Sequence, residues 1–254
     1  MGVSDVSDAL PPLALLAGGK ATRLGPIAAA RPKSLVEIAG EPFIAHQLRH
    51  VAHEGVTRVV ICIGHLGEQI EDVVGDGGAF GCQVSYSRDG PHLKGTAGAL
   101  KRALPQLGDA FMVMYGDSFL PIALAPVWAA FLRLGRPALM TVHANADRWD
   151  RSNAVYIPGQ VVRYDKRNPT PDMRHIDYGL GILTPGPFAD APDDAPTDLA
   201  DIYSDLARRG DLAGFEAQQR FYEIGSVSGI AETDAFLRER LGRRGATGAG
   251  SAKP

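Results

Sequence analysis

The order of apolar and polar positions divides the first half of the chain into short strands and longer helices. Near-continuous apolar runs alternate with stretches in which apolar residues recur every three or four positions. The predicted strands cover 13–19, 58–64, 83–87 and 110–117, and the predicted helices lie near 43–55, 66–75 and 96–107. This alternation is typical of βαβ units in a parallel sheet, and such apolar strands need helices on both faces of the sheet.

The second half has a more mixed pattern. Helices are expected near 124–134, 199–209 and 228–241, and strands at 138–144, within 153–166, at 178–185 and in "LAGFEA" and "FYEIG". We therefore expect antiparallel strands to be added to the parallel sheet. The pattern predicts a single domain over 13–241, a flexible N-terminus over 1–12 and a low-complexity, disordered tail over 242–254.

Charge and hydropathy limit the classes of partner. The chain has 254 residues, with 26 basic and 29 acidic ones, so its formal net charge of −3 gives no general attraction to nucleic acid or to an anionic membrane. Apolar runs stay well short of the ~18 residues of a membrane span. We expect a cytoplasmic protein with neither a nucleic-acid nor a membrane partner, and any anion must be bound locally.

Cysteines and tryptophans are expected inside the protein. Cys62 and Cys82 stand in strand-like runs without the spacing of metal ligands, which favours buried free thiols and a reducing compartment. Trp128 and Trp149 are expected in the core or at an interface.

A loop of small residues follows the first predicted strand. Gly18 and Gly19 would let backbone N–H groups approach a phosphate closely, although two glycines also suit an ordinary tight turn. The P-loop and the dinucleotide-binding fingerprint both require a different spacing. Arg23, Pro32 and Lys33 would also interrupt any helix here. The loop residues alone leave an anion site and a tight turn as alternatives.

A longer stretch resembles a known family. "LAGGKATRLGPIAAARPKSLVEIAGEPFIAHQL" resembles the L-A-G-G-x-G-T-R-L…P-K-x-L…G-x-P signature of the sugar-1-phosphate nucleotidyltransferases. The likeness continues in the family's order through "KGTAGAL", "YGDS", "RYDKRNP", "DYGLGIL" and "FYEIGS", so it covers roughly 13–240. The chain is similar to the small heptose- and hexose-1-phosphate guanylyl-, thymidylyl- and uridylyltransferases. The resemblance implies a Rossmann-like three-layer α/β/α fold with a mostly parallel, mixed central sheet.

The resemblance also implies catalytic and metal-binding roles. Arg23 would grip the triphosphate, because its planar fork matches phosphate oxygens, and Lys33 would lie near the α-phosphate and the sugar phosphate. Asp117 would hold Mg²⁺ together with Glu223, which stands where the family usually has aspartate. Ala21 is a second departure, since the family usually has glycine there.

The binding residues divide into two sets. Those matching the family's nucleotide site are Leu16, Ala17, Gly18, Gly19, Lys20, Ala21, Thr22, Arg23, Gly95, Thr96 and Gly98. Those matching the sugar-phosphate site are Asn153, Asp165, Lys166, Asp177 and Gly179. Thr96 also suits the N-cap of the helix near 96–107. Asp177 stands where relatives place Asn or Thr, a change that fits a different sugar.

The resemblance implies that a nucleoside triphosphate and a sugar 1-phosphate react to give a nucleotide sugar and pyrophosphate, with Mg²⁺ as cofactor. GTP with heptose 1-phosphate is the favoured pair. One alternative is transfer to a non-sugar phosphate such as phosphocholine, and another is a non-catalytic nucleotide-sensing domain. A nucleotide-sugar glycosyltransferase of related fold is disfavoured, because the chain has no D-x-D motif. The nucleobase and the sugar stay open, and the sequence is compatible with a homo-oligomer.

Overall fold

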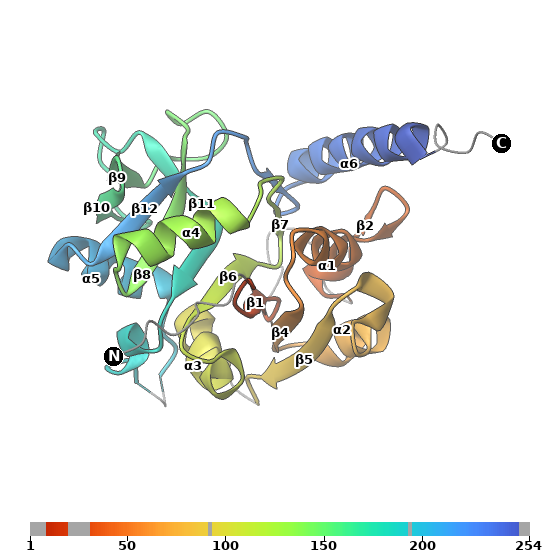
Figure 1. Cartoon of the computed structure of the whole chain (residues 1–254), viewed down its shortest axis with the longest axis horizontal. Coiled ribbons are helices and arrows are strands. Elements are labelled where there is room, and N and C mark those ends of the chain that lie inside the picture. The colour runs from red at the N-terminus through yellow and green to blue at the C-terminus, as the bar shows by residue number, and fades with distance from the viewer. Residues whose placement is uncertain (1–8, 20–30, 91–92, 193–194, 249–254) are drawn as a thin grey trace.

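A nine-stranded sheet runs through the protein. The computed structural model describes residues 9–19, 31–90, 93–192 and 195–248, and the sheet has the order β5-β4-β1-β6-β11-β8-β12-β10-β9 (Figure 1). Its strands are β1 (Leu13–Leu16), β4 (Arg58–Ile63), β5 (Gln83–Arg88), β6 (Phe111–Tyr115), β8 (Ala138–Ala144), β9 (Ala154–Ile157), β10 (Gln160–Tyr164), β11 (His175–Leu183) and β12 (Leu212–Glu216).

The direction of the strands changes in the middle of the sheet. β1 pairs in parallel with β4 and β6, and β4 pairs in parallel with β5, so these four strands form a parallel half. β11 is antiparallel to both β6 and β8, while β12 is parallel to β8 and antiparallel to β10. The antiparallel addition expected in the second half is therefore present, and it is joined to the parallel half through β11.

Helices cover both faces of the sheet. The helices α1 (Phe43–His53), α2 (Gly67–Val74) and α4 (Ala125–Leu134) pack on one face, and α3 (Gly95–Leu107) and α5 (Leu199–Arg209) on the other. β1 shows why: Leu13 and Leu15 join the core cluster under α1, α2 and α4, whereas Ala14 joins the cluster under α3 and α5. This arrangement confirms the predicted three-layer α/β/α fold with a mixed sheet.

Two short sheets and α6 (Val227–Gly248) lie beside the main sheet. β2 (Glu37–Ile38) pairs with β3 (Glu41–Pro42), and β7 (Ser118–Phe119) pairs with β13 (Tyr222–Glu223). A small core of Ile38, Phe43, Phe119, Ile224 and Leu237 joins these elements to α6, which lies along one edge of the molecule (Figure 1). The β7–β13 pair places β13 next to the segment that follows β6.

The described structure differs from the sequence prediction at a few places. α6 continues to Gly248, so 242–248 is helical where a disordered tail was expected. β11 begins at His175 and is irregular between Asp177 and Gly181, and the β2–β3 hairpin was not predicted. Cys62 and Cys82 are buried free thiols, as expected. Among the described helices, none combines the length and the apolar character needed to span a membrane.

Candidate active site

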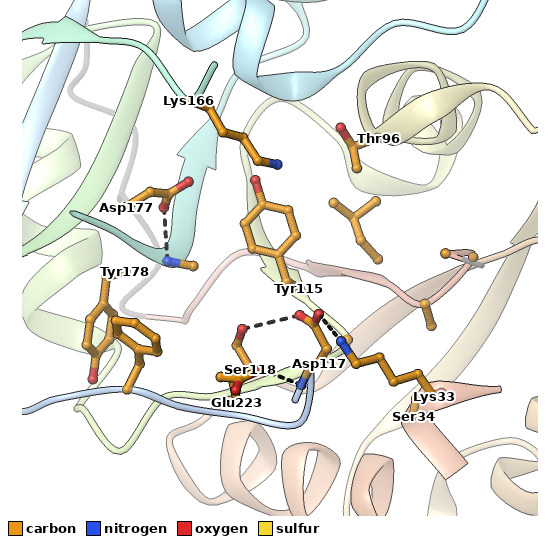
Figure 2. A pocket seen from close by; sticks show the side chains of 18 of the residues that line it. Lys33, Ser34, Thr96, Tyr115, Asp117, Ser118, Lys166, Asp177, Tyr178 and Glu223 are labelled. Atoms are coloured by element: carbon orange, nitrogen blue, oxygen red, sulfur yellow. Dashed lines mark hydrogen bonds and ion pairs between the residues drawn. The ribbon is translucent and has the colours of Figure 1, made fainter. Parts of the chain in front are cut away.

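A cavity of about 860 Å³ opens at the carboxyl ends of the central strands. Open α/β sheets bind ligands at this edge, where the strand order reverses. Its walls come from the ends of β1, β6, β10 and β11, from the start of α3, and from the β7–β13 sheet. Two sides can be distinguished: the β1–β6 side carries Lys33 and Asp117, and the β10–β11 side carries Lys166 and Asp177 (Figure 2).

An ion pair marks the β1–β6 side. Lys33 Nζ lies 2.8 Å from Asp117 Oδ2, and Ser118 Oγ donates to Asp117 Oδ1 at 3.3 Å. Lys33 begins a 3-10 helix after Pro32, and buried Leu35 fixes this helix in the core, so the lysine projects into the cavity. Its side chain is 19% exposed. The pair holds a cation and a carboxylate together in the cavity wall.

Glu223 reaches the same side through the β7–β13 sheet. Glu223 pairs in register with Ser118, and the backbone N–H of Ile224 donates to Asp117 O at 3.0 Å. The Glu223 carboxylate accepts hydrogen bonds from Gly225 N and, at 2.7 Å, from Ser226 Oγ. Glu223 therefore lines the cavity beside Asp117 and also stabilises the turn into α6.

The β10–β11 side is built around Asp177. Figure 2 shows Asp177 and Lys166 on one side of Tyr115, with Asp117 and Lys33 on the other. Asp177 Oδ1 accepts from Gly179 N at 2.9 Å, and Asn153 Oδ1 accepts from Asp177 N at 2.9 Å. These bonds fix Asp177 at the irregular part of β11, where β-bulges re-aim side chains.

Burial of the Asp177 carboxylate changes its pKa. Burial raises the pKa of Asp177 from 3.8 to about 6, although the Gly179 hydrogen bond, the Lys166 charge and the Tyr164 hydroxyl each lower it. The Tyr164 hydroxyl lies 3.4 Å from Asp177 Oδ2. Asp177 is consequently ionised near pH 8 but takes up a proton in mildly acidic solution.

The start of α3 lines the cavity and contacts the start of α5. Thr96 Oγ1 donates to Asp198 Oδ1 at 2.9 Å and accepts from Leu199 N at 2.7 Å, so Thr96 supports the start of α5 rather than capping α3. Gly95 has a φ of +72°, and a Cβ there would lie 2.4 Å from Thr197 O. Glycine at 95 is thus required by the 195–199 segment.

Most of the predicted site residues within the described part of the chain line this one cavity. They are Leu16, Ala17, Gly18, Gly19, Lys33, Gly95, Thr96, Asp117, Asn153, Lys166, Asp177, Gly179 and Glu223. Lys20, Ala21, Thr22 and Arg23 lie outside the described residues. Members of the predicted nucleotide, sugar-phosphate and metal-binding sets thus lie around one cavity, and their binding roles stay predictions.

Two predicted residues do not line the cavity. Gly98 lies on α3, where a Cβ would meet Lys94 Cβ at 2.7 Å. Asp165 Oδ1 accepts hydrogen bonds from Arg167 N at 2.9 Å and Asn168 N at 2.8 Å. Asp165 therefore shapes the turn that carries Lys166.

Sequence reasoning missed several residues that line the cavity. Trp149 is 40% exposed and lines the cavity together with Asp150. The prediction that it lies in the core is therefore wrong, and its alternative place at an interface stays a prediction. Tyr115 and Ser34 also line the cavity. Tyr115 could have been found from its position next to "GD", and Ser34 from its position next to Lys33. Nothing in the sequence marks Trp149.

The acidic residues on the β1–β6 side fit a magnesium ion. Asp117 and Glu223 both line the cavity, and their backbones are joined through the β7–β13 pair. Mg²⁺ is commonly held by one or two carboxylates together with substrate phosphates and water. The oxygen donors present therefore suit this ion.

The comparison with protein families decides the identity. A model described as Nucleotidyl transferase matches residues 14–151, more than half of the chain. The chain belongs to the nucleotidyl transferase family. This match confirms the family resemblance. A relative is the N-acetylmuramate alpha-1-phosphate uridylyltransferase of Neisseria meningitidis. It is 29% identical, and the similarity covers 87% of this chain and 96% of the relative.

Other nucleotidyl transferases agree with this placement. The glucose-1-phosphate thymidylyltransferase of Streptomyces antibioticus is 36% identical over 67% of this chain, which spans about half (49%) of that relative. A putative glucose-1-phosphate thymidylyltransferase from Bacillus anthracis, in complex with a sucrose, has a TM-score of 0.78 at 21% identity, covering 91% of this chain and 96% of its own. HddC from Yersinia pseudotuberculosis complexed with GMP-PN has a TM-score of 0.74 at 21% identity, covering 90% and 100%. These two structures share the fold.

Proposed function

We propose that this enzyme transfers a nucleotidyl group from a nucleoside triphosphate to a sugar 1-phosphate. An oxygen of the sugar phosphate attacks the α-phosphorus, a P–O bond forms, and the bond to the leaving pyrophosphate breaks. The observation that carries the proposal is a single cavity with Lys33 and Asp117 on one side and Lys166 on the other. Cations at both sides can hold two phosphate-bearing substrates against each other.

Alignment and charge neutralisation account for the rate, and no protein nucleophile is required. Lys33 would face the α-phosphate, and the Asp165 turn holds Lys166 where the acceptor's phosphate would bind. Asp117 and Glu223 would hold Mg²⁺, which supplies neutralisation of charge on the phosphate oxygens. The Ser118 hydroxyl and the Lys33 ammonium orient Asp117 before substrates arrive.

The first substrate pair we propose is GTP with heptose 1-phosphate, on the sequence resemblance. UTP is the next donor to test, because the Neisseria relative that matches this chain over nearly its whole length is named a uridylyltransferase.

A second candidate acceptor is phosphocholine. Trp149, Tyr178 and Phe221 line the cavity together with Asp177, and aromatic rings with a carboxylate can bind a quaternary ammonium group. This acceptor belongs in the same screen.

The deciding experiment measures pyrophosphate release for four nucleoside triphosphates against a set of sugar 1-phosphates and phosphocholine. We expect release with sugar 1-phosphates, and Asp117→Asn should lower kcat about a hundredfold or more. Glu223→Gln should be nearly inactive at limiting Mg²⁺, whereas Glu223→Asp should keep partial activity.

Lys166→Ala tests the acceptor side of the cavity separately from the nucleotide side. It should raise KM for the sugar phosphate far more than KM for the nucleotide. Nucleotide binding without pyrophosphate release for any acceptor would instead support a non-catalytic sensing domain. Release with phosphocholine alone would reject the sugar 1-phosphate.

A further inference from the structure

The β10–β11 side of the cavity has an unusual balance of charge for a site that binds a phosphate. Of the described residues that line the whole cavity, the basic ones are Lys33 and Lys166, and Lys33 is paired with Asp117. Asp177 lies on the β10–β11 side with Lys166, and Asp150 lines the same cavity. A sugar phosphate brings close to two negative charges of its own near neutral pH. Among the described residues, Lys166 is thus the cation on this side that can meet the phosphate, and the Asp177 carboxylate lies on the same side.

Asp177 is placed to accept hydrogen bonds from a ligand. An ionised carboxylate accepts about four hydrogen bonds and donates none. Within the described structure, Oδ1 is used by Gly179 N and Oδ2 by a long contact of 3.4 Å with the Tyr164 hydroxyl. Capacity is left on both oxygens, and a ligand must supply donors such as hydroxyl or amino groups.

Other arginines near this side are held outside the cavity. Arg220 Cζ lies 3.5 Å from the centre of the Trp149 ring, and Arg220 Nη2 lies 2.7 Å from Glu232 Oε2. Arg151 Nη2 donates to Pro169 O at 3.1 Å. Neither arginine lines the cavity. Within the described part of the cavity wall, a second negative group on an acceptor near Asp177 would therefore have no cation other than Lys166, which the acceptor's phosphate takes, to offset this carboxylate.

We infer that Asp177 restricts the acceptor to phosphates whose remaining groups are neutral or cationic hydrogen-bond donors, and excludes sugar phosphates that carry a second anion. This inference rests on the proposed function and adds a substrate class to it. Like charges brought together in a partly buried site repel strongly, because the effective dielectric constant there is about 20 rather than 80. Specificity then arises from rejection of the wrong acceptor as much as from attraction of the right one.

Two matched pairs of acceptors test the inference. Glucuronic acid 1-phosphate carries a carboxylate that glucose 1-phosphate lacks. N-acetylmuramate 1-phosphate likewise carries a carboxylate that N-acetylglucosamine 1-phosphate lacks. At pH 8, where Asp177 is ionised, the parent enzyme should favour the neutral member of each pair at least about tenfold in kcat/KM. A preference for the anionic members, or equal use of both, would overturn the inference.

The variant Asp177→Asn assigns the effect to this residue. Asparagine keeps an oxygen that can accept from Gly179 N, so the fold should be kept. Because the negative charge is lost, the ratio of the two kcat/KM values within each pair should fall severalfold toward one. Asp190→Asn is the matched control, because Asp190 is exposed and does not line the cavity; it should keep the parent ratio. An unchanged ratio in Asp177→Asn would contradict the assignment.

Failure of the proposed function gives a different result. If no triphosphate and sugar phosphate release pyrophosphate, transfer is rejected, and calorimetric binding of the same pairs then decides the inference. Tighter binding of the neutral members, with a smaller gap in Asp177→Asn, would support selection by charge. Turnover without a preference would leave the function standing and reject the inference. The kcat/KM ratio of the parent enzyme tests the inference even if the variant does not fold.

Discussion

The two glycines after β1 differ in what a side chain would meet. A Cβ at Gly18 would lie 3.0 Å from Gly64 N, whereas a Cβ at Gly19 would have no atom of the described residues within 4 Å. Both residues line the cavity. Packing against the backbone therefore explains the glycine at 18, whereas no described neighbour requires the glycine at 19, and close approach of a phosphate stays our prediction for it.

Gly19→Val should weaken binding of the nucleoside triphosphate at least about tenfold and leave the free energy of unfolding nearly unchanged. A branched side chain would keep phosphate oxygens away from the backbone N–H groups. Calorimetric titration and urea unfolding measure the two effects. Gly18→Val is the comparison, and it should lose stability because its neighbour is backbone. Unaltered nucleotide affinity in Gly19→Val would contradict the phosphate-binding role of this loop.

Asp177 makes stability depend on pH. Its pKa in the folded protein is raised from 3.8 to about 6, mainly by burial, with Lys166, Tyr164 and Asp198 as charged or titratable neighbours. As pH rises through this window the unfolded chain ionises first, so the folded state loses stability. Relative to the parent, Asp177→Asn should gain up to about 3 kcal/mol between pH 4 and 7. Urea unfolding at several pH values checks this, and Asp190→Asn should show no such gain.

The roles of neighbouring aspartates could not be told apart from the sequence. Asp165 and Asp177 both matched the sugar-phosphate site, but only the folded turn shows that Asp165 Oδ1 is used by two backbone N–H groups. The position of Trp149 likewise depends on contacts that only the folded loop shows. Its loop is fixed by Asn145, which bonds Trp149 N at 3.1 Å and Asp150 O at 2.6 Å. Contacts of this kind leave no periodic pattern in the sequence.

At the scale of elements, apolar runs predicted the main strands and helices well. α5 and β8 have the predicted bounds, because each buries a continuous apolar stripe or run against the sheet. The β2–β3 and β7–β13 pairs have strands of two residues, which are too short to show alternation. β13 lies within the predicted "FYEIG" strand, whereas its partner β7 was not predicted, and their pairing is what places Glu223 beside Asp117.

The irregular part of β11 depends on Gly179. Its φ is +96°, and a Cβ there would lie 3.5 Å or more from its neighbours, so the backbone conformation rather than space opposes a side chain. Gly179→Ala should destabilise the protein by about 1–3 kcal/mol and should also weaken binding at Asp177. Denaturant unfolding measures the first effect. Gly242→Ala, in α6 with no described atom within 4 Å of a Cβ there, should be neutral or stabilising.

At the scale of the whole molecule, the two halves of the sheet are joined around the cavity. β11 carries Asp177 and pairs directly with β6, which ends next to Asp117. Thr96 of α3 bonds Asp198 and the start of α5, which connects the helices on one face of the sheet. Elements of both halves of the sheet therefore meet at the cavity.

The central place of β11 has a consequence for any attempt to isolate the part matched by the family, 14–151. β6 pairs with β1 on one flank and with β11, at 175–183, on the other. A fragment ending at 151 would leave β6 as a sheet edge of apolar residues, which readily recruits strands from other chains. Such a fragment should self-associate during size-exclusion chromatography, unlike an otherwise identical full-length chain with intact β11. A monodisperse, folded monomer of 1–151 would show that the first half closes its own edge.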